Sequence, residues 1–508
     1  TSQPDALDPA LSYTQNSWEA MWLAYTPLLT YRRVDGDAGT ELIPGLAASL
    51  PDISADGKTY KLTLRKGLKY SNGTPVKASD FEHEIKRVLN LESGGSSFFE
   101  AIEGGTKYLE NGDPQADIPG IESDDATGEI TIRLNEPNGT FSNVLAMNFA
   151  ALVPSDTPFR NMSADPPPGV GPYKFTKSVP NREFVLQRVK GFDLPGIPPG
   201  NIDTITTKIV KSSTRQAQDV IRGDLDYMQD PLPPDIKPEV EQRYSDRYRT
   251  TVTISSYYFF LNNRLAPFDD PKVREAVNYG IDKTALARLY GGDLAPGCSF
   301  LPPGMPGYDE ALDLEGCPWG DPRKPPNLAK ARSLIEQAGA KGAKVTVWGN
   351  TDEPTPQVTE AYADMLRKIG LDAKVKVVDG GVYFSVIGNA KTKAQTGFAN
   401  WFQDFPHPRN FMFNVEGATI QPTNNQNYGN VDDPELNRGI AKLTREPKLT
   451  PPITAKWADL NRKLVERAWI VPFGHIKLPT FLSERMDFDN CSRFHPVYNN
   501  DYSSWCLK

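Results

Sequence analysis

The stretch from Glu41 to Leu89 reads ELIPGLAASLPDISADGKTYKLTLRKGLKYSNGTPVKASDFEHEIKRVL and carries the strongest fold signals in the chain. Its Asp56-Gly57 pair predicts a turn, because glycine adopts positive φ without a steric penalty. From Thr59 to Arg65 apolar and polar residues alternate. Such alternation predicts a strand with one buried face.

A helix is expected to follow near Ser79. Ser79 and Glu82 have the spacing of a capping box, in which the serine caps the first turn and the glutamate reaches back. Phe81, Ile85 and Leu89 then recur at helical spacing. The stretch therefore predicts a strand, a turn and a helix, in that order.

The same stretch resembles a sequence block of the bacterial family 5 extracellular solute-binding proteins, which are the oligopeptide- and dipeptide-binding components of ABC importers. Four further segments resemble blocks of that family and follow in the family's order: GVGPYKF at 169–175, GDLDY at 223–227, PFDDPKVREAV to IDK at 267–283, and WFQDFPHP at 401–408. Because five blocks occur in order, the resemblance is specific and extends over nearly the whole chain.

Length and charge agree with an extracellular binding protein. A chain of 508 residues can bury a large core and form two or three lobes. The net charge of −8 argues against a nucleic-acid partner, which would require a basic surface. No segment approaches the roughly 20 apolar residues of a membrane span. No signal peptide begins at Thr1, so we expect a mature or trimmed chain whose only membrane contact is a lipid anchor upstream.

The four cysteines are Cys298, Cys317, Cys491 and Cys506. None forms a C-x-x-C pair, so neither a zinc site nor a thioredoxin-like site is expected. Their order favours two local disulfides, Cys298–Cys317 and Cys491–Cys506, although four cysteines allow three connectivities and four reduced thiols are an alternative. Disulfides would indicate an oxidising compartment.

The expected fold class is α/β. Alternation at 130–134 adds a second strand to the one at 59–65, which predicts an antiparallel sheet within about 42–166. After residue 271, predicted helices alternate with strands at 344–348 and 372–378, which is typical of an α/β lobe.

The resemblance implies a bilobed fold of the periplasmic-binding-protein type II kind with an extra third domain. We expect a discontinuous lobe I made of residues 1–41, 167–265 and 476–508. An extra α+β domain would comprise 42–166 and attach to lobe I, and lobe II would comprise 266–475. Two chain crossings, near 265 and 475, would form the hinge.

Catalytic motifs are absent from the sequence. It contains no G-x-S-x-G, H-E-x-x-H or phosphate-loop string, and its histidines are only His83, His407, His475 and His495. We therefore expect a binding protein rather than an enzyme, with no cofactor and no bound metal. A secreted hydrolase is the less favoured alternative.

Asp404 is the principal candidate for ligand binding. It resembles the aspartate of the family's W-x-x-D-Y block, which in peptide-binding members pairs with the α-ammonium of the ligand through a charge-assisted hydrogen bond. Trp401 would then provide an aromatic wall and Phe402 a backbone edge. The alternative is a framework role for Trp401 and Asp404. His407 replaces the family's usual aspartate and is interpreted as a polar loop residue rather than a ligand contact or a metal ligand.

The resemblance also implies further positions that line the ligand, although a core or surface role is an equal alternative for each. They are Tyr13, Gln15 and Asn16 after the Asp8-Pro9 opening, Tyr257 on the strand entering the second lobe, and Phe473 and His475 on the strand leaving it.

The implied function is capture of a di- to oligopeptide between two lobes by hinge closure, followed by delivery to the transmembrane subunits of an ABC permease. The implied location is the periplasm or the outer face of the cell membrane, and we expect a monomer. The same scaffold could instead carry an oligosaccharide, an opine or a metal chelate, and the sequence leaves these alternatives open.

Overall fold

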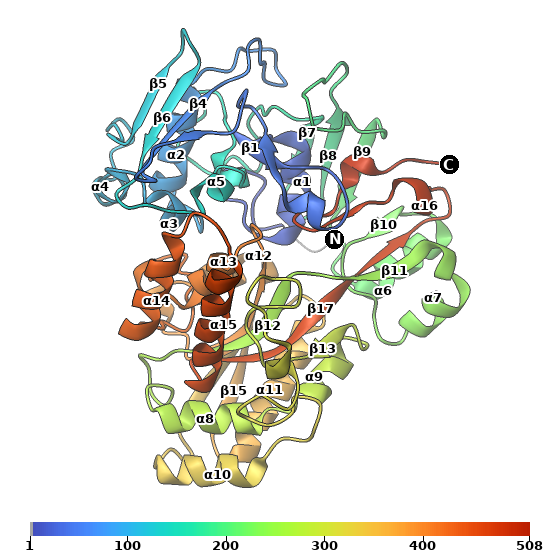
Figure 1. The fold of residues 1–508 in the computed structure, drawn as a ribbon. Helices are drawn as coiled ribbons and strands as arrows, with labels where there is room; N and C mark the ends of the chain where they lie inside the picture. Colours follow the sequence, from blue (N-terminus) through green and yellow to red (C-terminus); the bar gives the residue numbers. More distant parts are fainter. Residues whose placement is uncertain (1–3) are drawn as a thin grey trace.

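The long strand β17 (Ile470–Leu482) organises the largest sheet of the protein, as the computed structural model of residues 4–508 shows (Figure 1). Residues Ile470–Gly474 of β17 pair antiparallel with β12 (Ser255–Leu261), and residues Lys477–Phe481 pair with β11 (Tyr248–Val252). Only residues 253–254 separate β11 from β12, so both chain segments change sheet partners at the same place. The chain passes from β11 to β12 at residues 252–255, about ten residues before the hinge crossing predicted near 265. Strand β17 changes partner at residues 474–477, which include the crossing predicted near 475.

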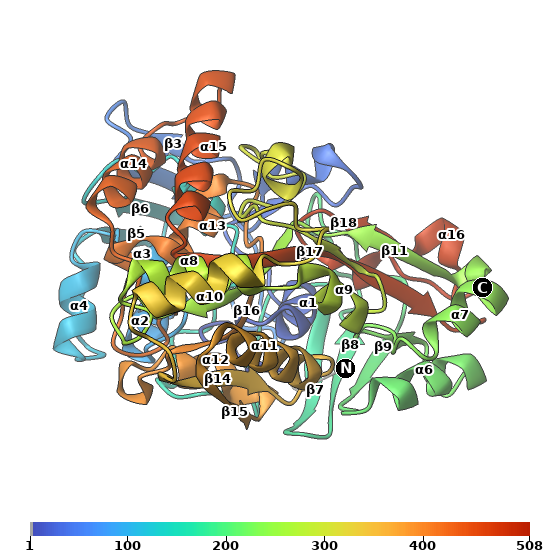
Figure 2. The same cartoon turned by 90° about the horizontal axis from the view of Figure 1, so that it is seen from below.

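Below that crossing in Figure 1, the sheet continues from β12 through β16 (Thr396–Phe402) and β14 (Lys344–Asn350) to β15 (Asp372–Val378). Strand β14 runs parallel to both β15 and β16. Helices α8 (Pro271–Gly280), α10 (Leu328–Gln337) and α11 (Thr355–Ile369) pack together around this end of the molecule (Figure 2). The alternation of helices and strands predicted after residue 271 is confirmed.

The other end of the molecule contains two antiparallel sheets of three or four strands, besides two-stranded ones (Figure 1). One has the order β3-β4-β6-β5, and in its strand β4 Tyr60 and Leu62 are buried while Lys61 and Thr63 are exposed, as the alternation predicts. The strand bounds are β3 (Asp52–Ile53), β4 (Thr59–Thr63), β5 (Ile121–Asp124) and β6 (Glu129–Arg133), and the second sheet contains β7 (Tyr173–Val179), β8 (Glu183–Arg188) and β9 (Thr204–Lys208).

Helix α2 (Ser79–Asn90) lacks the predicted capping box. The Ser79 hydroxyl donates a hydrogen bond to Asp125 Oδ2 at 3.0 Å, and Glu82 Oε1 accepts from the Ile118 N–H at 3.1 Å. Asp80 Oδ2 instead accepts from the Lys77 N–H at 2.9 Å. The capping-box prediction is wrong because partners distant in sequence engage both side chains.

The remaining elements complete the chain. The helices are α1 (Gln15–Ala24), α3 (Ser96–Phe99), α4 (Gly105–Asn111), α5 (Phe141–Val144), α6 (Ser213–Arg222), α7 (Lys237–Arg243), α9 (Lys283–Leu289), α12 (Gly380–Ile387), α13 (Pro408–Met412), α14 (Pro434–Thr444), α15 (Pro451–Glu466) and α16 (Phe488–Cys491); the strands are β1 (Leu29–Tyr31), β2 (Leu42–Pro44), β10 (Tyr227–Met228), β13 (Leu294–Pro296), β18 (Phe494–His495) and β19 (Asn499–Asn500). No helix within residues 4–508 combines the length and the apolar character needed to cross a membrane.

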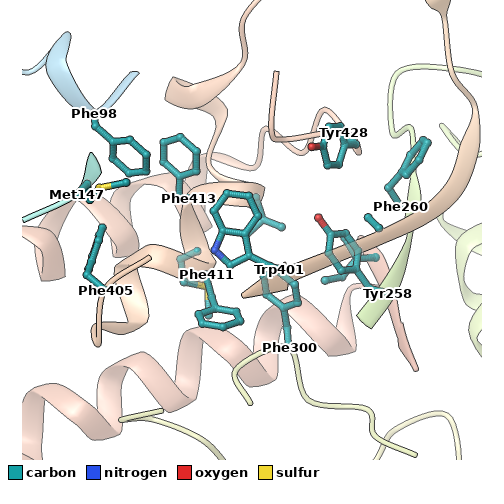
Figure 3. Packing of buried hydrophobic residues seen from close by; sticks show 14 of the residues in the cluster. Phe98, Met147, Tyr258, Phe260, Phe300, Trp401, Phe405, Phe411, Phe413 and Tyr428 are labelled. Carbon is teal, nitrogen blue, oxygen red and sulfur yellow. The ribbon is translucent and has the colours of Figure 1, made fainter. Parts of the chain in front are cut away.

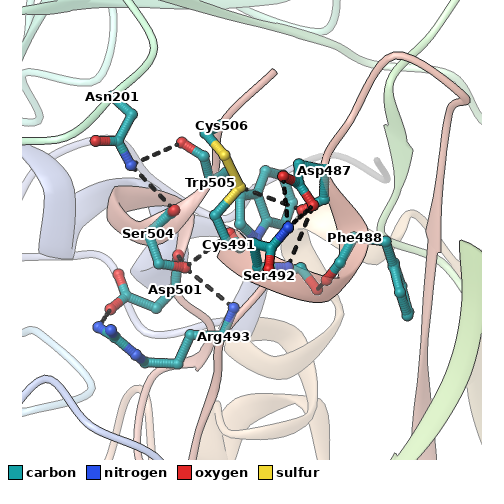
Figure 4. The surroundings of a disulfide bond; sticks show 11 residues. Asn201, Asp487, Phe488, Cys491, Ser492, Arg493, Asp501, Ser504, Trp505 and Cys506 are labelled. Atoms are coloured by element: carbon teal, nitrogen blue, oxygen red, sulfur yellow. Dashed lines mark hydrogen bonds and ion pairs between the residues drawn. A yellow bond between two sulfur atoms is a disulfide. The ribbon is translucent and has the colours of Figure 1, made fainter. Parts of the chain in front are cut away.

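Two disulfides close local loops, and their pairing confirms the prediction. Cys298 bonds to Cys317 and Cys491 to Cys506, with Cα–Cα distances of 6.0 and 5.8 Å. The second bridge ties α16 to the C-terminal segment, where the Asp487 N–H also donates to the Cys506 carbonyl (Figure 4). In the chain-entropy model, loops of this size gain about 3 kcal/mol each from the cross-link.

Candidate ligand-binding site

A cavity of about 430 Å³ lies between the two ends of the molecule. Its walls come from the loop before α1, the segments after β10, β14 and β16, the start of α12 and the loop 424–428. Seven of the nine predicted ligand-lining residues line it: Tyr13, Gln15, Asn16, Tyr257, Trp401, Phe402 and Asp404. The other two, Phe473 and His475, do not.

Asp404 is held just after β16 by neutral donors. Its Oδ2 accepts hydrogen bonds from the Asn410 side chain at 2.6 Å and from the Tyr13 hydroxyl at 3.2 Å, and its own N–H donates to Asn410 Oδ1 at 2.9 Å. Tyr13 belongs to the N-terminal segment, so the carboxylate joins the two walls of the cavity.

The electrostatic environment of Asp404 is unusual, because the carboxyl is 7% exposed and no lysine, arginine or histidine in residues 4–508 forms a salt bridge with it. Burial raises the pKa of Asp404 to about 7, although the hydrogen bonds from Asn410 and Tyr13 favour the ionised form. A carboxylate that lacks a counter-ion in a water-poor cavity is suited to bind a cation.

This raised pKa predicts the pH dependence of stability. The folded protein holds the Asp404 proton up to pH 7, whereas the unfolded chain releases it near pH 4. The carboxyl therefore stabilises ligand-free protein fully below pH 4, by on the order of 4 kcal/mol, and this contribution is lost as the pH rises through 7. We expect Asp404→Asn to be more stable than the wild type at pH 8 but not at pH 4.

Urea unfolding of both proteins at several pH values checks this expectation. Other buried acids, such as Glu84, titrate in both proteins, so the difference between the two curves isolates Asp404. Parallel curves from pH 4 to pH 8 would show that the carboxyl is not destabilised by the cavity.

Trp401 lines the cavity and also forms part of the framework that holds Asp404 in place. Its ring meets that of Tyr13 edge-on at 5.7 Å, and its Nε1–H donates to Asn410 Oδ1 at 3.1 Å. Behind it, Phe413 stacks on Phe98 at 4.6 Å, which links α3 to the segment after α13 (Figure 3). This aromatic cluster fixes the part of the wall that carries Asp404.

Two of the predicted ligand-lining residues, Phe473 and His475, lie outside the cavity, and so does His407. Phe473 is fully buried and stacks on Phe259 at 4.7 Å. His475 is buried beside Asp313, with 3.0 Å between Nε2 and Oδ2. His407 Nδ1 accepts from the Arg409 N–H at 3.1 Å and so caps α13, which supports the interpretation of a polar structural residue.

Several residues that line the cavity are not among those predicted from the sequence. Asp230 follows β10, Asp352 and Glu353 follow β14, and Tyr290 follows α9. Only Asp352 had an available signal, because it lies two residues beyond the carboxyl end of a strand with parallel neighbours, where α/β proteins place ligands. The others come from loops whose sequences show no distinguishing pattern.

Known proteins share the sequence and the fold of this chain. The family model described as bacterial extracellular solute-binding proteins, family 5 middle, matches residues 41–422. A probable D,D-dipeptide-binding periplasmic protein, DdpA of Escherichia coli (strain K12), is 24% identical over 462 residues, which are 88% of this chain and 83% of that protein. The resemblance drawn from the sequence blocks is confirmed.

Solved structures show the same fold over the full chain. The clavulanic acid biosynthesis oligopeptide binding protein 2 superposes with a TM-score of 0.84 at 25% identity, covering 100% of this chain and 94% of that one. DppA from Helicobacter pylori, solved with the peptide STSA, gives a TM-score of 0.82 at 21% identity and covers 100% and 96%. The predicted bilobed periplasmic-binding-protein fold with an additional domain is confirmed.

Proposed function

Because the chain belongs to the bacterial extracellular solute-binding proteins of family 5, we propose that it captures a peptide with a free amino terminus in the cavity around Asp404. The observation that carries this proposal is the buried carboxylate of Asp404, which faces the cavity without a counter-ion. An α-ammonium group would supply the missing positive charge and donate charge-assisted hydrogen bonds.

The ligand closes the protein about two adjacent crossings, at 252–255 and 474–477, where β11, β12 and β17 exchange partners. These crossings separate an α/β lobe with β12 to β16 from the rest of the chain, which contains the extra sheet β3 to β6. Contacts across the cavity support a closed state: Tyr13 donates to Asp404, Ser213 donates to Glu353 at 3.3 Å, and Lys211 pairs with Asp379 at 3.5 Å. A ligand that contacts both walls would stabilise the closed state further.

In this proposal the ligand is a peptide and the protein partner is the transmembrane part of an ABC permease. The protein acts in the periplasm or at the outer face of the cell membrane. We infer a monomer, with any membrane attachment through a lipid upstream of Thr1. An unpaired carboxylate favours a cationic anchor over a neutral oligosaccharide. None of the described residues that line the cavity is a histidine, lysine or cysteine, which supports ligand binding over hydrolysis through a Ser–His or Cys–His pair.

To test the proposal, the protein is denatured and refolded to remove any co-purified ligand. It is then incubated with a library of tripeptides that have free amino termini, and the peptides that stay bound are identified by mass spectrometry. An N-acetylated library is the matched control. We expect retention from the free library alone. Equal retention of both libraries, or of neither, would contradict peptide capture through the amino terminus.

Hinge closure gives a further expected result. A retained peptide at saturation should reduce the radius of gyration measured by small-angle scattering, because closure brings two lobes together. Calorimetry establishes saturation independently. An unchanged scattering profile in a saturated sample would contradict closure while leaving peptide binding intact.

A further inference from the structure

The cavity is lined by acids and by no bases. Among the described residues that line it are five carboxylic acids, Asp5, Asp230, Asp352, Glu353 and Asp404, but no lysine, arginine or histidine. The loop before α1 satisfies Asp5, whose carboxylate accepts from the Thr14 and Ser17 hydroxyls at 2.8 and 2.6 Å. The other four acids have no basic residue beside them in the described lining.

Two of these acids meet at α6, away from the Asp404 wall. The Gln216 side chain donates to Asp230 Oδ2, and Ser213, one turn earlier on the same helix, donates to Glu353. Asp230 and the Asp352-Glu353 segment therefore approach α6 from opposite walls of the cavity. The side chain of Lys211, which precedes α6, is 76% exposed and pairs with Asp379 at 3.5 Å.

Asp352 has no close partner for its charge, since the only attraction it feels is the weaker one of the exposed Lys211. Its carboxylate forms no hydrogen bond or salt bridge with any residue in 4–508, and it lies against the Cα of Gly380, where an added Cβ would come within 2.1 Å of Oδ2. Burial, followed by the charges of Asp230 and Asp379, raises the pKa of Asp352 to about 6. A second cavity group is also unsatisfied: the Tyr290 hydroxyl is buried without a hydrogen-bond partner, in a residue that is 4% exposed.

We propose that the ligand carries a second positive charge, a guanidinium or ammonium group, which lies between Asp230 and Asp352 while Asp404 holds the α-ammonium. This inference rests on the proposed function and narrows it to basic peptides. It follows from charge balance, because a neutral peptide would cover the half-buried Asp352 and leave its carboxylate without a salt-bridge partner. The ligand's own carboxylate finds no basic partner in the lining and so lies outside it or is blocked as an amide.

An organic cation fits this part of the cavity better than a metal ion. Among the described residues, neither Asp230 nor Asp352 belongs to a group of three ligand atoms within 4.8 Å of one another. Hard cations such as calcium need six to eight oxygen ligands at close range. A guanidinium group, by contrast, distributes five donors over a wide plane and can bridge separated carboxylates.

Calorimetry with matched peptides tests the proposal. The probes are tripeptide amides with alanine at two positions and arginine at the third, and the control peptides contain citrulline, which keeps the shape of arginine without its charge. Arginine is placed in turn at positions one, two and three. We expect at one position a preference for arginine over citrulline of tenfold or more, and we expect Asp352→Asn to reduce that preference at least fivefold.

Two controls separate this proposal from the proposed function. Asp193→Asn removes an exposed carboxylate elsewhere on the same chain and should leave the preference unchanged. If the arginine and citrulline peptides bind equally at every position, the second charge is overturned and peptide binding stands. Agmatine and spermidine, which are cations without a peptide backbone, serve as additional probes. If they bind and no peptide does, the cationic site stands and the proposal of peptide capture is contradicted. If no peptide or amine binds, both are overturned.

Discussion

Replacing Asp404 by asparagine should weaken binding of a peptide with a free amino terminus by at least about tenfold. Removing one partner of a desolvated charge pair leaves the other charge unpaired, which costs roughly 2–5 kcal/mol, and each 1.4 kcal/mol corresponds to a factor of about ten in affinity. Asparagine keeps the size of the side chain and an oxygen that can accept from Asn410. The change therefore removes the charge and preserves the local hydrogen bonds.

Calorimetry on four combinations measures this effect: wild type and Asp404→Asn, each with a free and an N-acetylated form of the same peptide. Wild type should discriminate strongly between the two peptides, and the variant should discriminate weakly. Tyr13→Phe is the matched control, because it removes a hydrogen bond to Asp404 but leaves the charge, and its effect should be smaller. If wild type binds both peptides equally, Asp404 has a framework role instead.

The fold could be predicted from local patterns where burial alone decides the structure. The strand at 59–63 is an example, because alternation of Tyr60 and Leu62 with Lys61 reports one buried face directly. The capping box at Ser79 failed, because the serine hydroxyl donates to Asp125, a residue distant in sequence, and caps no helix N–H. Local spacing contains no information about such partners.

Some residues of the candidate site could be predicted from the sequence and others could not. Asp404 and Trp401 were found because they lie in a sequence block that resembles a known family. Asp230 and Asp352 meet across the cavity from loops about 120 residues apart, and neither has a motif. Phe473 lies on β17 but does not line the cavity, and the sequence could not indicate this, because a strand buried on both faces shows no alternation that distinguishes them.

Replacing Arg87 by methionine should produce the largest loss of stability, about 3–5 kcal/mol, which is the usual cost of removing one partner from a buried ion pair. Arg87 lies on α2 with a fully buried side chain. Its Nη1 and Nη2 atoms donate to the two carboxylate oxygens of Asp8 at 3.1 and 2.7 Å, and Nη1 also donates to Glu84 Oε2 at 2.8 Å. Methionine fills similar space but leaves both acids without a counter-charge.

The loss should depend on pH in a defined direction. Burial raises the pKa of Glu84 to about 8, even though Arg87 lowers it and Asp8 adds to the rise. Without Arg87 the pKa of Glu84 rises further, so below about pH 8 Glu84 is protonated in both folded proteins and does not change the difference between them. Above pH 8 the wild-type carboxyl ionises beside Arg87 while the variant still holds the proton, so we expect the difference between wild type and Arg87→Met to be larger at pH 9.5 than at pH 7, as measured by urea unfolding at both values.

Lys86→Met provides the matched control, because the neighbouring lysine pairs with Glu82 nearer the surface, at side-chain exposures of 13% and 18%. This pair retains some contact with solvent, so its loss should cost less than that of the fully buried Arg87. Arg87→Met should also weaken peptide binding, because Asp8 holds the base of the segment that brings Tyr13 to Asp404. Adding Asp8→Asn to Arg87→Met should restore part of the stability, since one uncompensated charge is removed. If Arg87→Met loses no more than Lys86→Met, the buried triad provides no net stability, and the N-terminal wall of the cavity is held by packing alone.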